Sequence, residues 1–137
     1  MQIPTLGLAL MSIAIVQYGA IPLIADLNAT HARNPRWPAH ARFHVVTQVL
    51  TGAAVAALAM FLLWSPRVER STGVCLAAVL SFCVLGAFFV STALRSLYGG
   101  ALSDAEGGVP RTRGIDLNLL NFGLALVLLV AGRLMLL

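Results

Sequence analysis

Charged residues are scarce in this chain of 137 residues, and lysine is missing altogether. Only 10% of the residues are charged and 59% are hydrophobic, whereas a soluble domain carries about 25% charged residues to cover its surface. The mean hydropathy of +0.89 agrees with this deficit. The composition therefore excludes an ordinary soluble domain and indicates an integral membrane protein.

All nine basic residues are arginines, and the net charge is +4. The arginines are scattered and flank apolar segments instead of forming a basic cluster, so we expect no nucleic-acid partner. Arginine at a membrane boundary sets orientation and pairs with lipid phosphate. Membrane lipid is therefore the expected partner of these side chains.

Cysteine is also rare, with only Cys75 and Cys83 in the chain. Their spacing corresponds to about 12 Å along a helix, which is too far for a disulfide, so we expect both to be small apolar core residues. The chain is apolar from Ile3 onward with no basic residue before it. This pattern predicts a retained first helix and not a cleaved signal peptide.

Four apolar segments are long enough to cross about 30 Å of hydrocarbon as helices, and they cover about residues 4–24, 41–64, 73–94 and 115–137. Backbone polar groups in lipid must be paired internally. The predicted fold is therefore all-α, an integral membrane four-helix bundle forming a single transmembrane domain over residues 1–137. Trp37 and Trp64 are expected interface anchors of the second segment. Small residues within the last three segments predict close helix packing, within one chain or between chains: Gly52, Ala56, Ala57, Gly86, Ala87, Gly123 and Ala131.

The arginines are distributed unevenly between the two ends of this bundle. Loops one and three, with the adjoining helix ends, hold Arg33, Arg36, Arg42, Arg95, Arg111 and Arg113, and the opposite end holds Arg67, Arg70 and Arg133. Because basic residues favour the cytoplasmic side, we expect loops one and three inside and both termini outside. The expected location is a bacterial inner membrane.

The segment from Asp26 to His44 contains all three histidines, His31, His40 and His44. His40 and His44 are four residues apart, so a helix presents them on one face, and Gln48 continues that face by another turn. Other polar residues fall toward the same end of their own segments: Gln17, Tyr18, Arg95, Asp116, Asn118 and Asn121. This pattern predicts a polar cup open to one membrane face, with an apolar floor. A purely structural role at the headgroups is the alternative.

An apolar floor suits a lipophilic small molecule as substrate, and histidine with carboxylate suits acid–base chemistry. The first hypothesis is therefore a membrane enzyme that catalyses isomerisation, cyclisation or hydration. Its catalytic candidates are His40, His44, Asp26 and Asp116, and its substrate-binding candidates are Gln17, Tyr18, Gln48, Arg95, Asn118 and Asn121. We expect His44 to lie nearest the centre of function, paired with Asp26, Asp116 or Asn118.

Two other hypotheses remain open. Asp26, His31, His40 and His44 offer three nitrogens and one oxygen, a set that suits a transition metal and a metal-dependent oxidoreductase. A short chain with little soluble mass also suits a non-enzymatic subunit or assembly factor, as a homo-oligomer or in a larger membrane complex.

The run from His31 through Asn34-Pro35, Trp37 and His40 to Phe43-His44 resembles a signature of uncharacterised small four-helix membrane proteins. That resemblance implies the topology but no activity. The architecture is also similar to that of small membrane isomerases and terpene cyclases, whose helical cups use carboxylates and histidines. No residue role is carried over from that likeness, because their catalytic motifs do not align with this chain.

Overall fold

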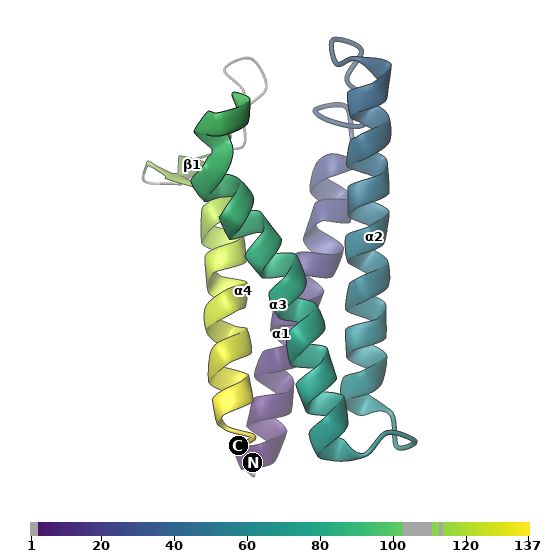
Figure 1. Ribbon diagram of the computed structural model, residues 1–137, viewed down its shortest axis with the longest axis vertical. Helices are drawn as coiled ribbons and strands as arrows, with labels where there is room; N and C mark the ends of the chain where they lie inside the picture. The colour runs from purple at the N-terminus through teal and green to yellow at the C-terminus, as the bar shows by residue number, and fades with distance from the viewer. Residues whose placement is uncertain (1–2, 103–110, 113) are drawn as a thin grey trace.

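The computed structural model describes residues 3–102, 111–112 and 114–137 and consists mainly of four helices (Figure 1). These are α1 (Ile3–Asp26), α2 (Ala39–Trp64), α3 (Arg70–Leu94) and α4 (Leu117–Leu134). The 3₁₀ turn η1 (Arg95–Tyr98) extends α3. All four helices are long and apolar enough to cross a membrane. The predicted all-α four-helix fold is therefore confirmed.

The helix boundaries differ from the predicted segments by a few residues, for local reasons. Helix α3 begins at Arg70 because the Glu69 side chain caps its first turn. Residues 115–116 are not helical, because β2 (Ile115–Asp116) pairs antiparallel with β1 (Arg111–Thr112) before α4 begins. Pro38 is the residue directly before α2, and its backbone has an extended ψ of 142°.

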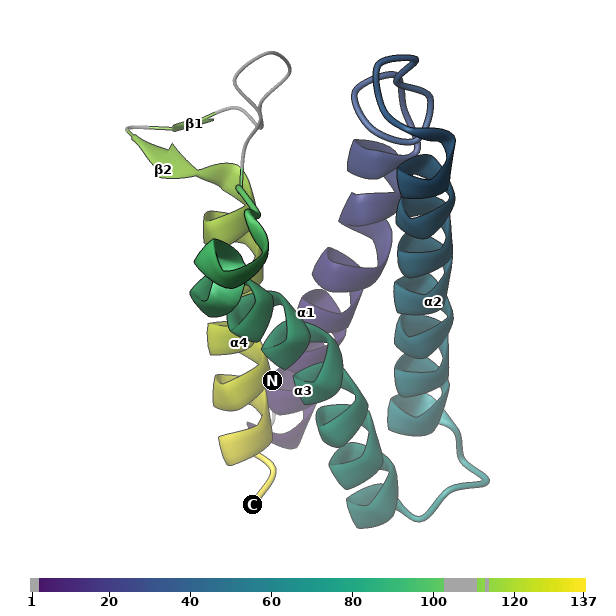
Figure 2. The same cartoon turned by 45° about the horizontal axis from the view of Figure 1, so that its top comes forward.

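The helices run alternately up and down, so the N- and C-terminal ends lie together at one end of the bundle (Figure 1). Helix α1 packs against both α2 and α4. Helix α3 begins beside the end of α2 and finishes close to the beginning of α4, so it crosses the bundle obliquely (Figures 1 and 2). As a result, α2 and α3 diverge toward the end that carries loops one and three.

The core lies along α1, where Met11, Ile15 and Tyr18 are almost completely buried. Close backbone approach makes this packing possible. A Cβ added to Gly132 would lie 2.7 Å from the Gly7 carbonyl oxygen, so α4 touches α1 directly at this pair. In the membrane, where apolar surface supplies little driving force between helices, such close contact is the main source of association.

The small-residue packing prediction holds within the described chain at Ala56, which is buried and meets Gly19 of α1. Gly52, Gly86 and Gly123 do not mediate helix contacts within the described chain, since a Cβ added at each would meet nothing within 4 Å. The prediction that Cys75 and Cys83 are core residues is wrong, because both are exposed. The reason is that the outer surface of a membrane bundle is also apolar, so small apolar residues can occupy either face of a helix.

Candidate functional site

Loop one, residues 27–38, is held by its own side chains. The Asn28 Oδ1 atom accepts hydrogen bonds from the Thr30 amide at 2.8 Å and the Thr30 hydroxyl at 2.6 Å. The Thr30 hydroxyl also lies 2.8 Å from His31 Nδ1. Because this hydroxyl gives its only hydrogen to Asn28, the Nδ1 atom of His31 must carry the hydrogen of that second bond.

Asn34 is the buried centre of loop one, with 6% of its surface exposed. Its side-chain nitrogen donates to the Thr30 carbonyl at 3.1 Å, and its side-chain oxygen accepts from the Arg36 amide at 3.0 Å. The sequence pattern around Asn34 predicts no role for this residue. Its position directly before Pro35 in a short, polar connector is the signal that indicates a turn-forming residue.

Asp26 and His31 form one of two side-chain pairs in this region. The His31 Nδ1 atom lies 3.9 Å from Asp26 Oδ1, and the His31 ring contacts the edge of Trp37 at a centroid distance of 5.1 Å. Trp37, the predicted interface anchor, therefore also packs against His31 within loop one.

His40 and His44 form the second pairing, which we call the histidine pair. Their Nε2 atoms lie 2.9 Å apart, and the rings meet edge to face at 4.4 Å between centroids. The expectation that Asp26, Asp116 or Asn118 contacts His44 is wrong. In the described part of the chain its hydrogen-bond partner is His40, because one helical turn brings the two rings together on the exposed side of α2.

The histidine pair begins a longer polar face of α2, which comprises five exposed residues: His40, His44, Thr47, Gln48 and Thr51. This polar face runs from the first turn of α2 to about the middle of the helix, roughly 18 Å along its axis. Polar groups at this depth in a bilayer must meet protein, water or ligand. The Thr47 hydroxyl donates a hydrogen bond to the Phe43 carbonyl oxygen at 3.0 Å.

A contact near the C-terminal end of α2 shows which side of the helix carries the polar face. Leu62 comes 18 residues after His44, which is about five complete turns, so both residues point in the same direction. Gly73 of α3 packs directly on the Leu62 carbonyl. Helix α3 thus covers this side of α2 near loop two and lies apart from α2 toward the beginning of α2 (Figure 2).

Gln17 and Asn121 are the two predicted substrate-binding residues that the structure brings together across helices. The Gln17 Nε2 atom donates to Asn121 Oδ1 at 3.4 Å, which links α1 to α4. The remaining Gln17 Oε1 and Asn121 Nδ2 atoms are buried and have no partner among the described residues. One acceptor and one donor thus lie unsatisfied at this junction.

Tyr18 is buried in a contact between two helices. It is 2% exposed, and its hydroxyl lies 3.1 Å from the Ser81 hydroxyl on α3. Ser81 in turn donates to the Ala77 carbonyl at 2.7 Å. The pair joins α1 to α3 where the two helices cross.

Two other predicted residues are engaged at helix ends. The Asp116 side chain caps α4 by accepting the Asn118 amide at 2.8 Å, and the Arg95 guanidinium donates to the Thr92 carbonyl at 2.6 Å at the end of α3. Gln48 is exposed on α2. Apart from Gln48, the predicted site residues therefore form separate pairs and caps and are not gathered around one centre.

The four candidate metal ligands likewise form two pairs, Asp26 with His31 and His40 with His44. Within the ranges 3–102, 111–112 and 114–137, no group of three or more His, Cys, Asp or Glu side chains is close enough to hold an ion. A metal at the histidine pair would need ligands from elsewhere.

Together, these observations define a class: a four-helix chain suited to span a membrane, with polar and histidine side chains gathered at one end. The chain belongs to the DUF6640 family of unknown function, which matches residues 10–113. The match includes all of loop one and the histidine pair. No curated protein and no solved structure matches the chain.

Proposed function

We propose that this protein is an integral membrane enzyme that moves protons on a lipophilic substrate, with the histidine pair as its proton-handling group. Isomerisation is the reaction that the geometry supports best. The observation that carries the proposal is the hydrogen bond of 2.9 Å between His40 Nε2 and His44 Nε2.

Between two neutral rings, that bond determines which ring nitrogens carry a hydrogen. One Nε2 must carry a hydrogen and the other must be bare, so the first ring has a bare Nδ1 and the second carries Nδ1–H. The histidine pair therefore offers one base and one acid at the same time. Proton donation and acceptance by positioned side chains contribute about 10²–10⁴-fold to a rate.

A proton relay through the pair balances without any other reactant. The bare Nδ1 takes a proton from one carbon of the substrate, the hydrogen between the Nε2 atoms crosses to the second ring, and that ring gives its Nδ1 hydrogen to another carbon. A double bond shifts in the substrate. The pair ends in the opposite tautomer, ready for the reverse reaction.

The surroundings of the histidine pair support a lipophilic substrate. Phe43 is exposed beside His44, with ring centroids 5.9 Å apart, and the polar face then descends through Gln48 and Thr51 into an apolar span. A molecule with one polar group and a hydrocarbon body fits such a surface. In this proposal Asp26 and Asp116 orient loop one and α4, while the arginine asymmetry supports a cytoplasmic histidine pair in a bacterial inner membrane.

Carbon-bound deuterium provides a test that needs no known substrate. Membranes containing the wild-type protein are incubated in D₂O, and the extracted lipophilic compounds are analysed by mass spectrometry after return to H₂O. We expect one compound to gain deuterium at carbon with the wild type. Since the relay needs both rings, His40→Gln and His44→Gln should each slow this gain by about 10²-fold or more.

His31→Ala is the matched control, because His31 pairs within loop one and not with the histidine pair. It should leave the deuterium gain unchanged. Deuterium gain that is equal in the wild type and the His40→Gln and His44→Gln variants would contradict the proposal. One equivalent of bound transition metal that His44→Gln removes would favour metal chemistry instead.

A second candidate function is that of a subunit in a larger membrane complex, which the open space in front of Gly52 on α2 favours. Small residues allow another helix to approach closely. In that case the polar face would contact a partner protein, and the His44→Gln variant would run as a smaller species on a native gel.

A further inference from the structure

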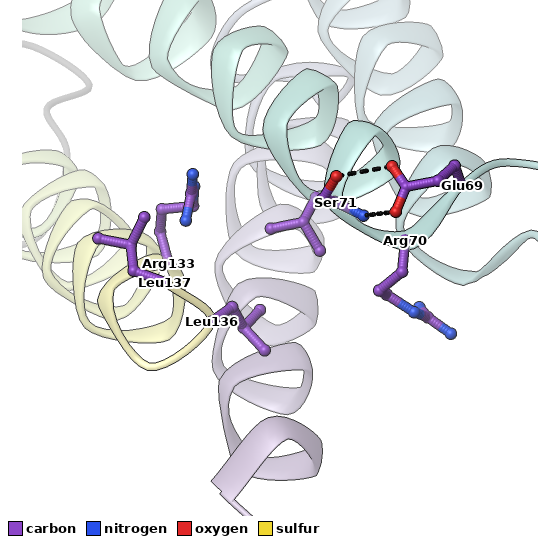
Figure 3. Close-up of a pocket in the computed structure, with 7 residues that line it drawn as sticks. Glu69, Arg70, Ser71, Arg133, Leu136 and Leu137 are labelled. Carbon is purple, nitrogen blue, oxygen red and sulfur yellow. Dashed lines mark hydrogen bonds between the residues drawn. The ribbon is translucent and has the colours of Figure 1, made fainter.

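A pocket with a volume of about 400 Å³ lies at the loop-two end of the bundle, opposite the histidine pair (Figure 3). It lies between the beginning of α3 and the end of α4 and is lined by Glu69, Arg70, Ser71, Val74, Arg133, Leu136 and Leu137. This volume falls within the usual range of small-molecule sites. The proposed function does not use this pocket.

The charged groups of this loop-two pocket differ in how far they are already engaged. The Glu69 carboxylate is held by Ser71 and Thr72 at the start of α3, and the Arg70 guanidinium donates to the Leu63 carbonyl at 2.7 Å. The Arg133 side chain has no hydrogen-bond or ion-pair partner in the part of the chain that the structure describes. Figure 3 shows Arg133 on α4, separated from the Glu69–Ser71 group on α3.

The rest of the lining is apolar. Val74 lies one turn inside α3, and Leu136 and Leu137 follow the last turn of α4. Leu136 also packs toward Gly7 of α1. The loop-two pocket therefore combines an unpaired cation with hydrocarbon contacts at the end of the spans, the depth at which lipid headgroups meet acyl chains.

We propose that the loop-two pocket binds an anionic phospholipid. The planar guanidinium of Arg133 pairs with the phosphate through two hydrogen bonds, and an acyl chain lies along Leu136 and Leu137, the apolar lining residues that are not buried. Because the Arg133 side chain has no partner among the described residues, its charge is available to a headgroup, which favours a lipid of net negative charge over a zwitterionic one. This inference is independent of the histidine pair.

Native mass spectrometry of the purified full chain tests the proposal, with dioleoyl phosphatidylglycerol and dioleoyl phosphatidylcholine as probes. We expect the wild type to retain one phosphatidylglycerol in preference to phosphatidylcholine. The R133Q variant should bind phosphatidylglycerol about tenfold more weakly, since charge-assisted hydrogen bonds are lost. R133K should recover part of the affinity, because it keeps the charge but loses the paired geometry.

Arg67 supplies the matched control, because it is exposed at the same end of the bundle and does not line the loop-two pocket. R67Q should bind phosphatidylglycerol as the wild type does. Equal loss in R67Q and R133Q would overturn the proposal in favour of general surface charge, and no loss in R133Q would overturn it outright. The thermal unfolding of R133Q should match the wild type, as expected for a side chain without partners.

Inorganic phosphate distinguishes the lipid from a free anion. At about 10 mM, roughly tenfold above a weak Kd of about 1 mM, it should not displace phosphatidylglycerol, because the acyl contacts contribute to binding. Displacement by inorganic phosphate in the wild type but not in R133Q would show a simple anion site and overturn the assignment to phospholipid.

Discussion

The carboxylate of Glu69 accepts four hydrogen bonds at the beginning of α3. The donors are the amide and hydroxyl groups of Ser71 and Thr72, at 2.6 to 2.9 Å. These bonds lower the pKa of Glu69 to about 2. Its charge is therefore retained at the first turn of α3, where the helix dipole also favours a negative group.

The depressed pKa of Glu69 predicts a pH dependence with a defined sign. The stabilisation is fully present above the unfolded pKa of about 4.3 and is lost as the pH falls toward the folded pKa of about 2. Glu69→Gln should therefore lower the melting temperature of the detergent-solubilised protein at pH 7, and the difference from wild type should shrink between pH 5 and pH 2. A difference that stays constant over this range would contradict the assigned role of the charge.

Residue spacing predicted part of the chemistry in the histidine segment. The interval of four between His40 and His44 correctly indicated that they share one face of a helix, because that geometry is fixed by the helix itself. The role of Asn34 could not be derived in the same way. Its amide bonds depend on the path of loop one, and that path follows from the contacts of the whole segment.

Two glycines determine how closely helices α1 and α4 approach each other. Gly7 and Gly132 bring the two backbones together, and a Cβ on either residue would lie under 3.0 Å from the carbonyl oxygen of the other. A backbone atom cannot move aside without shifting its helix. The two helices must therefore separate if either glycine gains a side chain.

Gly132→Ala should lower the free energy of unfolding by about 1–3 kcal/mol, the usual cost of overpacking. Gly123→Ala is the matched control on the same helix, because its added Cβ would meet nothing within 4 Å. We expect it to be neutral or slightly stabilising, since alanine favours helix. Thermal unfolding in detergent measures both variants, and equal effects would contradict the proposed contact.

Hydropathy predicted the four helices well, because length and apolar composition alone determine whether a segment can cross a membrane. Hydropathy did not predict which face of each helix points toward the interior of the bundle. A Cβ added to Gly52 would meet no neighbour and Cys75 is exposed, and a chain that is apolar all round gives no periodic signal for the interior. Only contacts between helices, such as that of Gly19 with Ala56, decide which small residues face inward.

The whole molecule has two chemically different ends. One end carries loop one and the histidine pair. At this end α3 lies apart from α2 (Figure 1). The other carries both termini, Arg133 and the loop-two pocket. Sequence reasoning placed polar residues at the first end through their positions in the four segments. The loop-two pocket depends on the oblique crossing of α3, which no local pattern encodes.

We predict that four membrane spans separate these two ends, and cysteine accessibility shows which side of the membrane each end faces. In a Cys75→Ala, Cys83→Ala background, Arg67→Cys probes loop two and Ala101→Cys probes loop three, since both positions are exposed. A membrane-impermeant maleimide should label Arg67→Cys in intact cells and Ala101→Cys only after permeabilisation. Labelling of both positions from the same side would contradict the four-span arrangement.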